Sequence, residues 1–240
     1  MKSLLLNQGT YPLRLIVMLG LVLMSASPAQ SLDSMIVFSS DREGRLDIFV
    51  MKSDGSRQRN LTQNPASVHI DPAWSPDGRK IAFERFGKIY VMNNADGEHL
   101  INLTPNQPNP ASRAPAWSPD GRKIAFRSNR DGNWEIYVMN ADGTEQVQLT
   151  NTDTLPNDFP VYNRNPFWSP NSRKIGFDSN RNGNYEIYVM DADGDNPTNL
   201  TQNPASDIGG SWVLGELAVS PKTRLLTPWG EIKVLEGEEK

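Results

Sequence analysis

The chain has 240 residues, of which 37% are hydrophobic and 22% charged, and its formal net charge at pH 7 is −4. This length is sufficient for one large domain or two small ones with a buried core. The lack of cysteine excludes disulfides, a thiolate nucleophile, a cysteine-ligated zinc site and a lipid-modified N-terminal cysteine. The acidic balance argues against non-specific nucleic-acid binding, which requires a basic surface.

The first 29 residues have the order of features found in a secretory signal peptide. Lys2 and Arg14 precede an uncharged apolar run at residues 15–24, and the small-residue stretch SASPA follows it. An apolar run of this length is too short to span a bilayer, which takes about 20 residues. We therefore expect a signal peptide at residues 1–29 and a mature chain from Gln30 with no transmembrane segment. The expected location is periplasmic or extracellular.

An internal repeat dominates the rest of the chain. The segment PAWSPDGRKIAF occurs at residues 72–83 and again at 115–126, and PFWSPNSRKIGF occupies 166–177. Each is followed by a second shared segment (GKIYVMNNADG, GNWEIYVMNADG or GNYEIYVMDADG) and then by NLT or QLT. A partial copy without the tryptophan segment precedes them, and AVSPKTRLLTPWGEIKVL at 218–235 is a degenerate copy whose AVSP aligns with AWSP. Because an active site is rarely built three times, the repetition indicates architecture rather than catalysis.

Each copy is predicted to contain four short strands. The first strand ends at the tryptophan, and SPDG supplies the proline, aspartate and left-handed glycine of a tight turn. RKIAF and EIYVM, which are rich in β-branched and aromatic residues, form the second and third strands, and the stretch ending in LT forms the fourth. Four antiparallel strands repeated every ~40–45 residues are typical of a β-propeller. We therefore predict an all-β fold, a β-propeller of four-stranded antiparallel blades.

The propeller is expected to occupy residues 30–240 with about four or five blades. The copies lie at about 35–71, 72–114, 115–165 and 166–210, and the degenerate tail lies at 211–235. Four blades result if the tail supplies the missing first strand of the first copy, and five result if the tail forms its own blade. A propeller that does not close exposes strand edges, so homo-oligomerisation through those edges is a further alternative.

The repeat also carries a family resemblance. WSPDGRKIAF followed by SNRDGNWEIYVMNADG resembles the WD40-like (PD40) repeat of the TolB-like β-propeller family, over about residues 35–206. The resemblance implies an extracytoplasmic propeller that binds other proteins. TolB itself has a six-bladed propeller behind an N-terminal α/β domain and belongs to the Tol–Pal envelope system. Here the repeats begin directly after the expected signal peptide, without room for that domain, and are too few for six blades. Only the fold and a protein-binding habit are therefore carried over.

Propeller geometry sorts the loops onto two faces. Because strand direction alternates, the loops between second and third strands share one face with the connections between blades. The connections differ from copy to copy (QNPASVHID, PNQPNPASRA, NTDTLPNDFPVYNRN and QNPASDIGG). Binding residues concentrate on variable loops held by a rigid framework, so we place the function on this face. The longest connection, residues 151–165, contains Phe159, Tyr162 and Arg164, although its two aromatic residues could instead cap the adjacent blade.

The candidate partner-binding residues are Phe159, Tyr162, Arg164, Arg130, Trp134 and Tyr185. Arg130 has equivalents in two other copies, Arg42 and Arg181, and acidic residues recur at another equivalent position, Asp47, Glu135 and Glu186. These pairs either line a charged ring around the central channel or tie a loop to its own blade. An exposed pair of the second kind contributes about 0–1 kcal/mol.

No motif predicts catalysis, a cofactor or a metal site. Residues 178–189 begin like a calcium loop but end in Val189 where a glutamate is required. His69 and His99 occupy non-equivalent positions, and no GxSxG motif is present. We therefore predict a secreted, non-enzymatic propeller that binds a protein partner of the cell envelope. The alternatives are a glycan-binding or polysaccharide-processing propeller and a self-associating structural component of the envelope.

Overall fold

The computed structural model describes residues 34–63, 66–93, 97, 99–105, 111–152 and 160–213. All of them belong to the second of the two units into which the chain divides, Ser34–Lys240. The expected signal peptide, Phe159 and the tail beyond residue 213 lie outside the described residues. No helix in the described part is long and apolar enough to cross a membrane.

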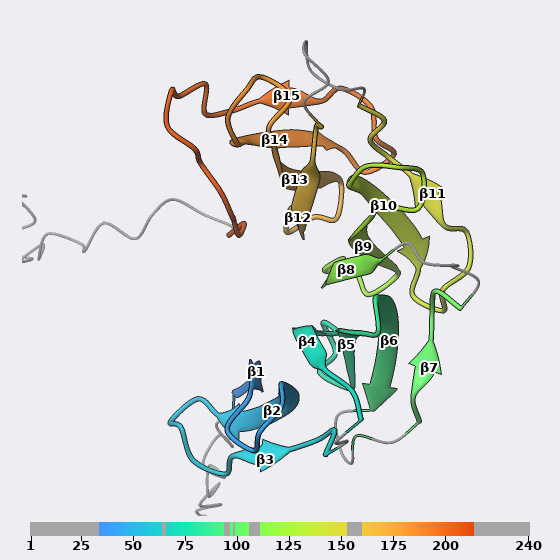
Figure 1. Cartoon of the computed structure of the whole chain (residues 1–240), viewed down its shortest axis with the longest axis vertical. Helices are drawn as coiled ribbons and strands as arrows, with labels where there is room; N and C mark the ends of the chain where they lie inside the picture. The colour runs from blue at the N-terminus through green and yellow to red at the C-terminus, as the bar shows by residue number, and fades with distance from the viewer. Residues whose placement is uncertain are drawn as a thin grey trace, which may run out of the picture. The chain divides into compact units, whose positions relative to one another are not determined.

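The described residues form an all-β propeller of about four blades, as predicted (Figure 1). The first sheet contains β1 (Met35–Ser40), β2 (Asp47–Lys52) and β3 (Arg59–Asn60). The second contains β4 (His69–Trp74), β5 (Lys80–Arg85), β6 (Lys88–Asn93) and β7 (Ile101–Asn102). The third contains β8 (Ser112–Trp117), β9 (Lys123–Ser128), β10 (Glu135–Asn140) and β11 (Val147–Gln148). The fourth contains β12 (Asn163–Trp168), β13 (Lys174–Ser179), β14 (Glu186–Asp191) and β15 (Thr198–Asn199).

The repeated SPDG segment makes the tight turn that the sequence predicts. In the second sheet the Ser75 hydroxyl donates to Asp77 Oδ1 at 2.6 Å, and Ser75 Oγ accepts from the Lys80 amide at 2.9 Å. Gly78 has a φ of 67°, which a residue without a Cβ adopts at little cost. The third sheet repeats these bonds at Ser118. The duplicated dodecamer is therefore a local folding unit, with a polar turn joining the first strand of a sheet to its largely buried second strand.

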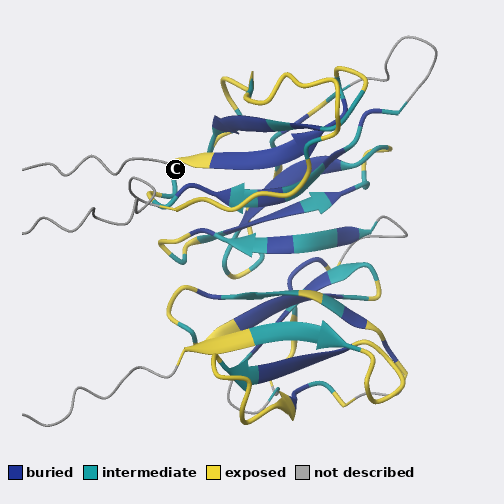
Figure 2. Cartoon of the chain, turned by 90° about the vertical axis from the view of Figure 1, so that its left-hand side faces the viewer, coloured by how far each residue is buried: buried dark blue, intermediate teal, exposed yellow. Residues whose placement is uncertain are grey.

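Apolar side chains pack between successive sheets, and Figure 2 shows burial concentrated in the strands and exposure at the turns. One core cluster joins the second sheet to the third (Ala82, Ile89, Val91, Leu103, Ile124, Phe126, Tyr137 and Met139). Within the second, third and fourth sheets a fully buried phenylalanine stacks on a tyrosine, as Phe126 does on Tyr137 at 5.7 Å between ring centroids. Of the repeat tryptophans, Trp168 joins two sheets by a hydrogen bond, since its Nε1 donates to Ala116 O of the preceding sheet at 3.0 Å.

A close backbone contact between neighbouring sheets explains the glycine of the ADG turns. The pairs are Gly97 with Leu61, Gly143 with Leu103 and Gly194 with Leu149. A Cβ on Gly143 would lie 3.0 Å from the Leu103 carbonyl oxygen, which is closer than a normal contact. The equivalent Gly55 of the first sheet has nothing within 4 Å, and the equivalent Leu200 of the fourth sheet is 58% exposed. Within the described residues, the glycine turn of the first sheet and the leucine of the fourth sheet therefore have no neighbouring sheet to contact.

Residues 207–212 follow the path of the first strand of a further blade. The Asp207 amide donates to Tyr185 O at 2.7 Å, just as the Asn163 amide at the start of β12 donates to Trp134 O at 2.7 Å. The third residue has a positive φ in both segments, 52° at Asn165 and 71° at Gly209. Trp212 therefore takes the position of the repeat tryptophan, six residues before the point at which the sequence alignment begins the degenerate copy.

Candidate functional site

Two rims of the propeller differ in character. The loop rim comprises residues 41–46, 86–87, 129–134 and 180–185 together with the connections between sheets; the turn rim comprises the SPDG-type and ADG-type turns. Hydrogen bonds join the two kinds of loop-rim segment, as between the Ser112 amide and Gly87 O at 2.7 Å. The turn rim is nearly constant between copies, whereas the loop rim varies. The variable rim is therefore the candidate functional surface.

Three of the predicted residues on the loop rim, Trp134, Arg164 and Tyr185, take part in cation–π contacts. The Arg164 guanidinium carbon lies 3.6 Å from the centroid of the Tyr185 ring. The Trp134 ring has two guanidinium carbons near it, that of Arg127 at 4.8 Å and that of Arg113 at 5.5 Å. Cation–π contacts of this kind hold both the ring and the arginine in place. The sequence analysis identified Trp134, Arg164 and Tyr185 but not Arg113 or Arg127.

The other predicted residues have different surroundings. Tyr162 is half-buried, and its amide donates to Asn180 Oδ1 at 2.6 Å. Phe159 lies outside the described residues. Arg130 is directed into its own sheet, where its guanidinium carbon lies 4.4 Å from the Tyr137 ring centroid and Nη1 donates to Gln146 Oε1 at 2.8 Å. Burial accordingly lowers the pKa of Arg130.

The expected pairing of Arg130 with Glu135 does not occur. Glu135 instead accepts hydrogen bonds from Thr150 Oγ1, from the amide and hydroxyl of Thr152, and from Asn163 Nδ2. These bonds tie the long connection to the third sheet. Neither Arg130 nor Glu135 belongs to a charged ring around the channel, because Arg130 contacts Tyr137 and Gln146 and Glu135 accepts the hydrogen bonds just described.

Phe86 is an exposed aromatic residue of the loop rim that the sequence analysis did not identify. It forms the two-residue hairpin between β5 and β6 together with Gly87, and its side chain is 62% exposed. Its φ is 52°, which is uncommon for a bulky residue and costs roughly 1–3 kcal/mol. The signal was present in the sequence, since this loop is four residues shorter than its equivalents in the third and fourth copies.

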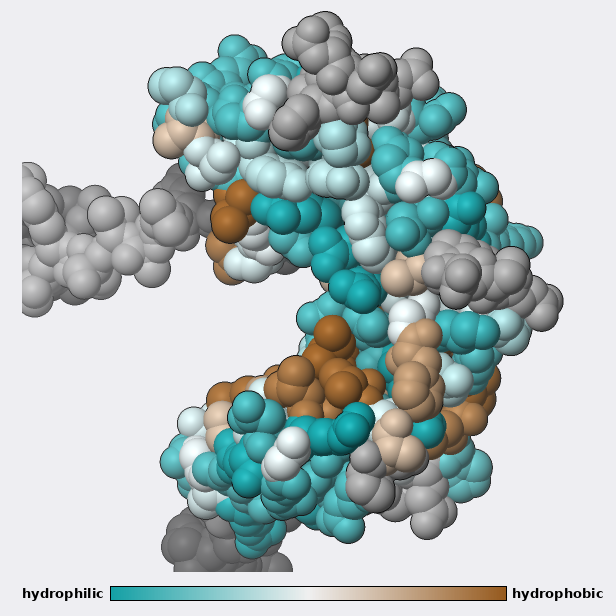
Figure 3. All heavy atoms as spheres, in the orientation of Figure 1, coloured by the Kyte–Doolittle hydropathy of each residue, from teal (hydrophilic) through white to brown (hydrophobic). Residues whose placement is uncertain are grey.

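Charge and polarity vary along the first strands of the sheets. In Figure 3 apolar atoms gather over β1 and β4, and hydrophilic atoms gather over β8 and β12. Arg113 Nε on β8 lies 3.4 Å from Glu84 Oε2, and burial raises the pKa of Glu84. Arg164 Nε on β12 lies 3.6 Å from Asp178 Oδ2, and burial likewise raises the pKa of Asp178. Each carboxylate is thus partly desolvated beside an arginine.

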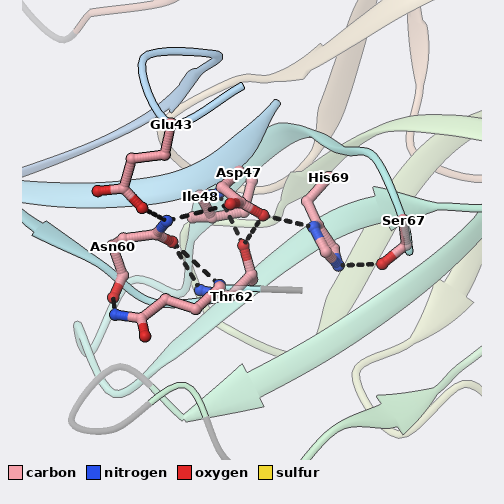
Figure 4. Close-up of polar contacts among 8 residues, drawn as sticks. Glu43, Asp47, Ile48, Asn60, Thr62, Ser67 and His69 are labelled. Carbon is pink, nitrogen blue, oxygen red and sulfur yellow. Dashed lines mark hydrogen bonds and ion pairs between the residues drawn. The ribbon is translucent and has the colours of Figure 1, made fainter. Parts of the chain in front are cut away.

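A buried Ser–His–Asp cluster lies between the first and second sheets (Figure 4). His69 Nδ1 and Asp47 Oδ1 are 3.0 Å apart, and Ser67 Oγ and His69 Nε2 are 3.1 Å apart. A neutral His69 with its proton on Nδ1 donates to Asp47 and accepts from Ser67. Ser67 is 1% exposed, so its hydroxyl is closed to a substrate.

Electrostatics and the repeat assign this cluster a structural role. Burial lowers the pKa of His69, against the opposing influence of Asp47. Burial acts to raise the pKa of Asp47, but hydrogen bonds from Asn60, Thr62 and His69 outweigh it and hold the pKa below its ordinary value. In the third and fourth sheets the equivalent positions hold Glu135 and Asn163, which are joined by a hydrogen bond. The same junction is therefore built with different residues and without a nucleophile.

Two further features are part of the framework. A depression of about 270 Å³ on the turn rim is lined by residues of the SPDG turns, including Asp77 and Asp120, and by Lys80 and Trp117. Asp178, the first residue of the calcium-like segment, accepts hydrogen bonds from Asn165 Nδ2 at 2.7 Å and from the Gly209 amide at 2.9 Å. In the described residues no group of three or more histidine, aspartate or glutamate side chains could hold a metal ion.

Comparisons with known proteins identify relatives of this repeat. No family model matches the chain. A Protein TolB homolog from Chlorobium luteolum is 31% identical over 163 residues, which are 66% of this chain and 34% of that protein. The chain thus spans about a third of the length of this curated relative.

Solved structures agree with that relationship. A putative TolB from Agrobacterium tumefaciens is 26% identical with a TM-score of 0.58, covering 69% of this chain and 60% of its own. TolB from Acinetobacter baumannii is 24% identical with a TM-score of 0.59, covering 74% of this chain and 44% of its own. An oligogalacturonate lyase from Vibrio parahaemolyticus, 11% identical with a TM-score of 0.52 and coverages of 68% and 48%, shares the fold alone. The repeat, the sheet order and these relatives together show that the chain is a β-propeller similar to that of TolB proteins.

Proposed function

We propose that the chain is a periplasmic, non-catalytic scaffold that binds a protein partner of the cell envelope through its loop rim. The family resemblance supports protein binding, and the signal-peptide pattern of residues 1–29 supports export. Function within a shared fold is set by its sites, so the proposal rests on what the loop rim presents.

The observation that carries the proposal is the exposed Phe86. An apolar ring that is 62% exposed in a left-handed backbone conformation contributes little to folding, and such strain is concentrated at functional sites. Its neighbours on the rim include Arg85, whose guanidinium carbon lies 5.3 Å from the Phe86 ring centroid. Aromatic residues and arginines are the types that anchor protein interfaces. Rigid sheets hold these groups in place, which keeps the ordering cost of binding low.

Affinity capture from the envelope of the source organism tests the proposal. The baits are the wild type, a loop-rim variant (Phe86→Ser with Arg164→Ala) and a turn-rim control (Arg79→Ala with Arg122→Ala). All four side chains lie outside the buried core, so each variant is expected to fold. We expect one protein to be enriched by the wild type and the control and lost by the loop-rim variant. Equal capture by all three baits, or no enrichment, would contradict the proposal.

A further inference from the structure

The third sheet carries two arginines at directly paired positions on its first two strands. Arg113 on β8 pairs with Arg127 on β9, whereas the equivalent pairs are Ile70 with Glu84 in the second sheet and Arg164 with Asp178 in the fourth. Like charges directly opposite each other destabilise a sheet. The fourth sheet avoids this cost by pairing opposite charges. The third sheet retains the repulsion between its two arginines, so the stability of the sheet does not account for the presence of Arg127.

Of these three arginines, Arg127 is the one with no carboxylate within ion-pair distance among the described residues. Arg113 and Arg164 lie within 3.4 and 3.6 Å of Glu84 and Asp178. Among the described residues Arg127 forms no ion pair or side-chain hydrogen bond, and its Nε is buried without a partner. Burial lowers the pKa of Arg127, together with the like charges of Arg113 and Arg164 and against the attraction of the exposed Asp71 and of Glu84. A desolvated guanidinium in this state favours an incoming anion.

The surroundings of Arg127 hold its guanidinium in a fixed place. The Trp134 ring centroid lies 4.8 Å from the Arg127 guanidinium carbon and 5.5 Å from that of Arg113. Stacking on an aromatic face orients the planar fork, which matches the two oxygens of a carboxylate. Phe86 belongs to the same rim, since Gly87 O accepts from the amide of Ser112, the residue before Arg113. An anion site and an exposed apolar group are thus neighbours.

We propose that Arg127, with Arg113 and Trp134, binds a carboxylate of an acidic peptide segment supplied by the partner protein. This inference rests on the proposed function and names the chemistry of the partner. An acidic side chain reaches the two arginines while an adjoining apolar side chain packs on Phe86. Binding relieves the repulsion between Arg113 and Arg127, so the sheet is more stable with the ligand than without it.

Calorimetric titration with acetylated tetraglutamate tests the proposal, with acetylated tetraglutamine and inorganic phosphate as comparison probes. We expect tetraglutamate to bind the wild type and Arg127→Ala to weaken that binding about tenfold or more, as expected when a charged hydrogen-bond partner is lost. Arg122→Ala on the turn rim removes the same charge and is expected to leave binding unchanged. Raised salt is expected to weaken the binding of tetraglutamate, because the ion pairs between its carboxylates and the two arginines are partly exposed to solvent.

Stability measurements separate a lost site from a lost fold. Because Arg127→Ala removes a like-charge pair, its thermal midpoint is expected to equal or exceed that of the wild type, whereas a purely structural arginine would lower it. Equal affinity for tetraglutamate and tetraglutamine, no binding of tetraglutamate, or equal losses in Arg127→Ala and Arg122→Ala would each overturn the inference. Phosphate binding as tight as that of tetraglutamate would instead identify a small-anion site. If the chain does not prefer tetraglutamate to tetraglutamine but still captures its partner through the loop rim, this inference is wrong and the proposed function is not affected.

Discussion

Replacing Gly143 by alanine tests how the sheets are joined. Its φ of 89° disfavours any side chain, and a Cβ there would lie 3.0 Å from Leu103 O and 3.1 Å from Leu103 Cα. The left-handed conformation costs about 1–2 kcal/mol, and forcing a methyl group into a packed contact adds roughly 1–3 kcal/mol. We therefore expect Gly143→Ala to lower the free energy of unfolding by about 2–5 kcal/mol.

Gly55→Ala is the matched control for this change. Gly55 occupies the equivalent turn of the first sheet with a φ of 82° but has nothing within 4 Å, so it bears the conformational cost alone. Urea denaturation followed by far-UV circular dichroism measures both variants under the same conditions. We expect Gly143→Ala to be less stable than Gly55→Ala by about 1–3 kcal/mol. Equal losses would show that the close contact between sheets is not required.

Three further predictions concern buried polar groups. The pKa of His69 is lower in the folded chain than in the unfolded chain, so the free energy of unfolding should fall as the pH drops below about 6.5. In denaturation measured at several pH values, His69→Asn should lose this dependence of stability on pH. Trp168→Phe should cost about 1 kcal/mol more in thermal unfolding than Trp117→Phe, because Trp168 Nε1 donates across the sheets whereas Trp117 Nε1 has no hydrogen-bond partner. Arg130→Ala should lower stability by about 1–2 kcal/mol without affecting partner capture, and loss of capture by a folded variant would contradict its structural role.

The repeat makes most of this fold predictable from the sequence. Three copies of one turn and two strands show which positions are constant, and a constant position such as Ser75 or Gly143 serves packing or turn geometry. Arg130 also occupies a constant position, with equivalents at Arg42 and Arg181. Arg130 is constant because it stacks within its sheet, and this constancy could have been taken as evidence against a binding role.

The candidate site depends on departures from the repeat, which sequence reasoning handles less well. The shortened loop at Phe86 is visible in the sequence, but its 62% exposure depends on the hairpin geometry. The pairing of Arg113 with Arg127 depends on strand register across a β-bulge, and 14 residues separate them in the chain. The contact of His69 with Asp47 joins two sheets, so no local pattern indicates it.

The central claim is that a partner binds the loop rim and not the turn rim. A photo-cross-linking amino acid placed at Phe86, and in a second protein at Arg122, tests this directly when each protein is irradiated in its native cell envelope. Both positions are exposed, and they lie on opposite rims. The account predicts one discrete adduct from position 86 and none from position 122. An adduct from position 122 alone, or the same adduct from both positions, would contradict it.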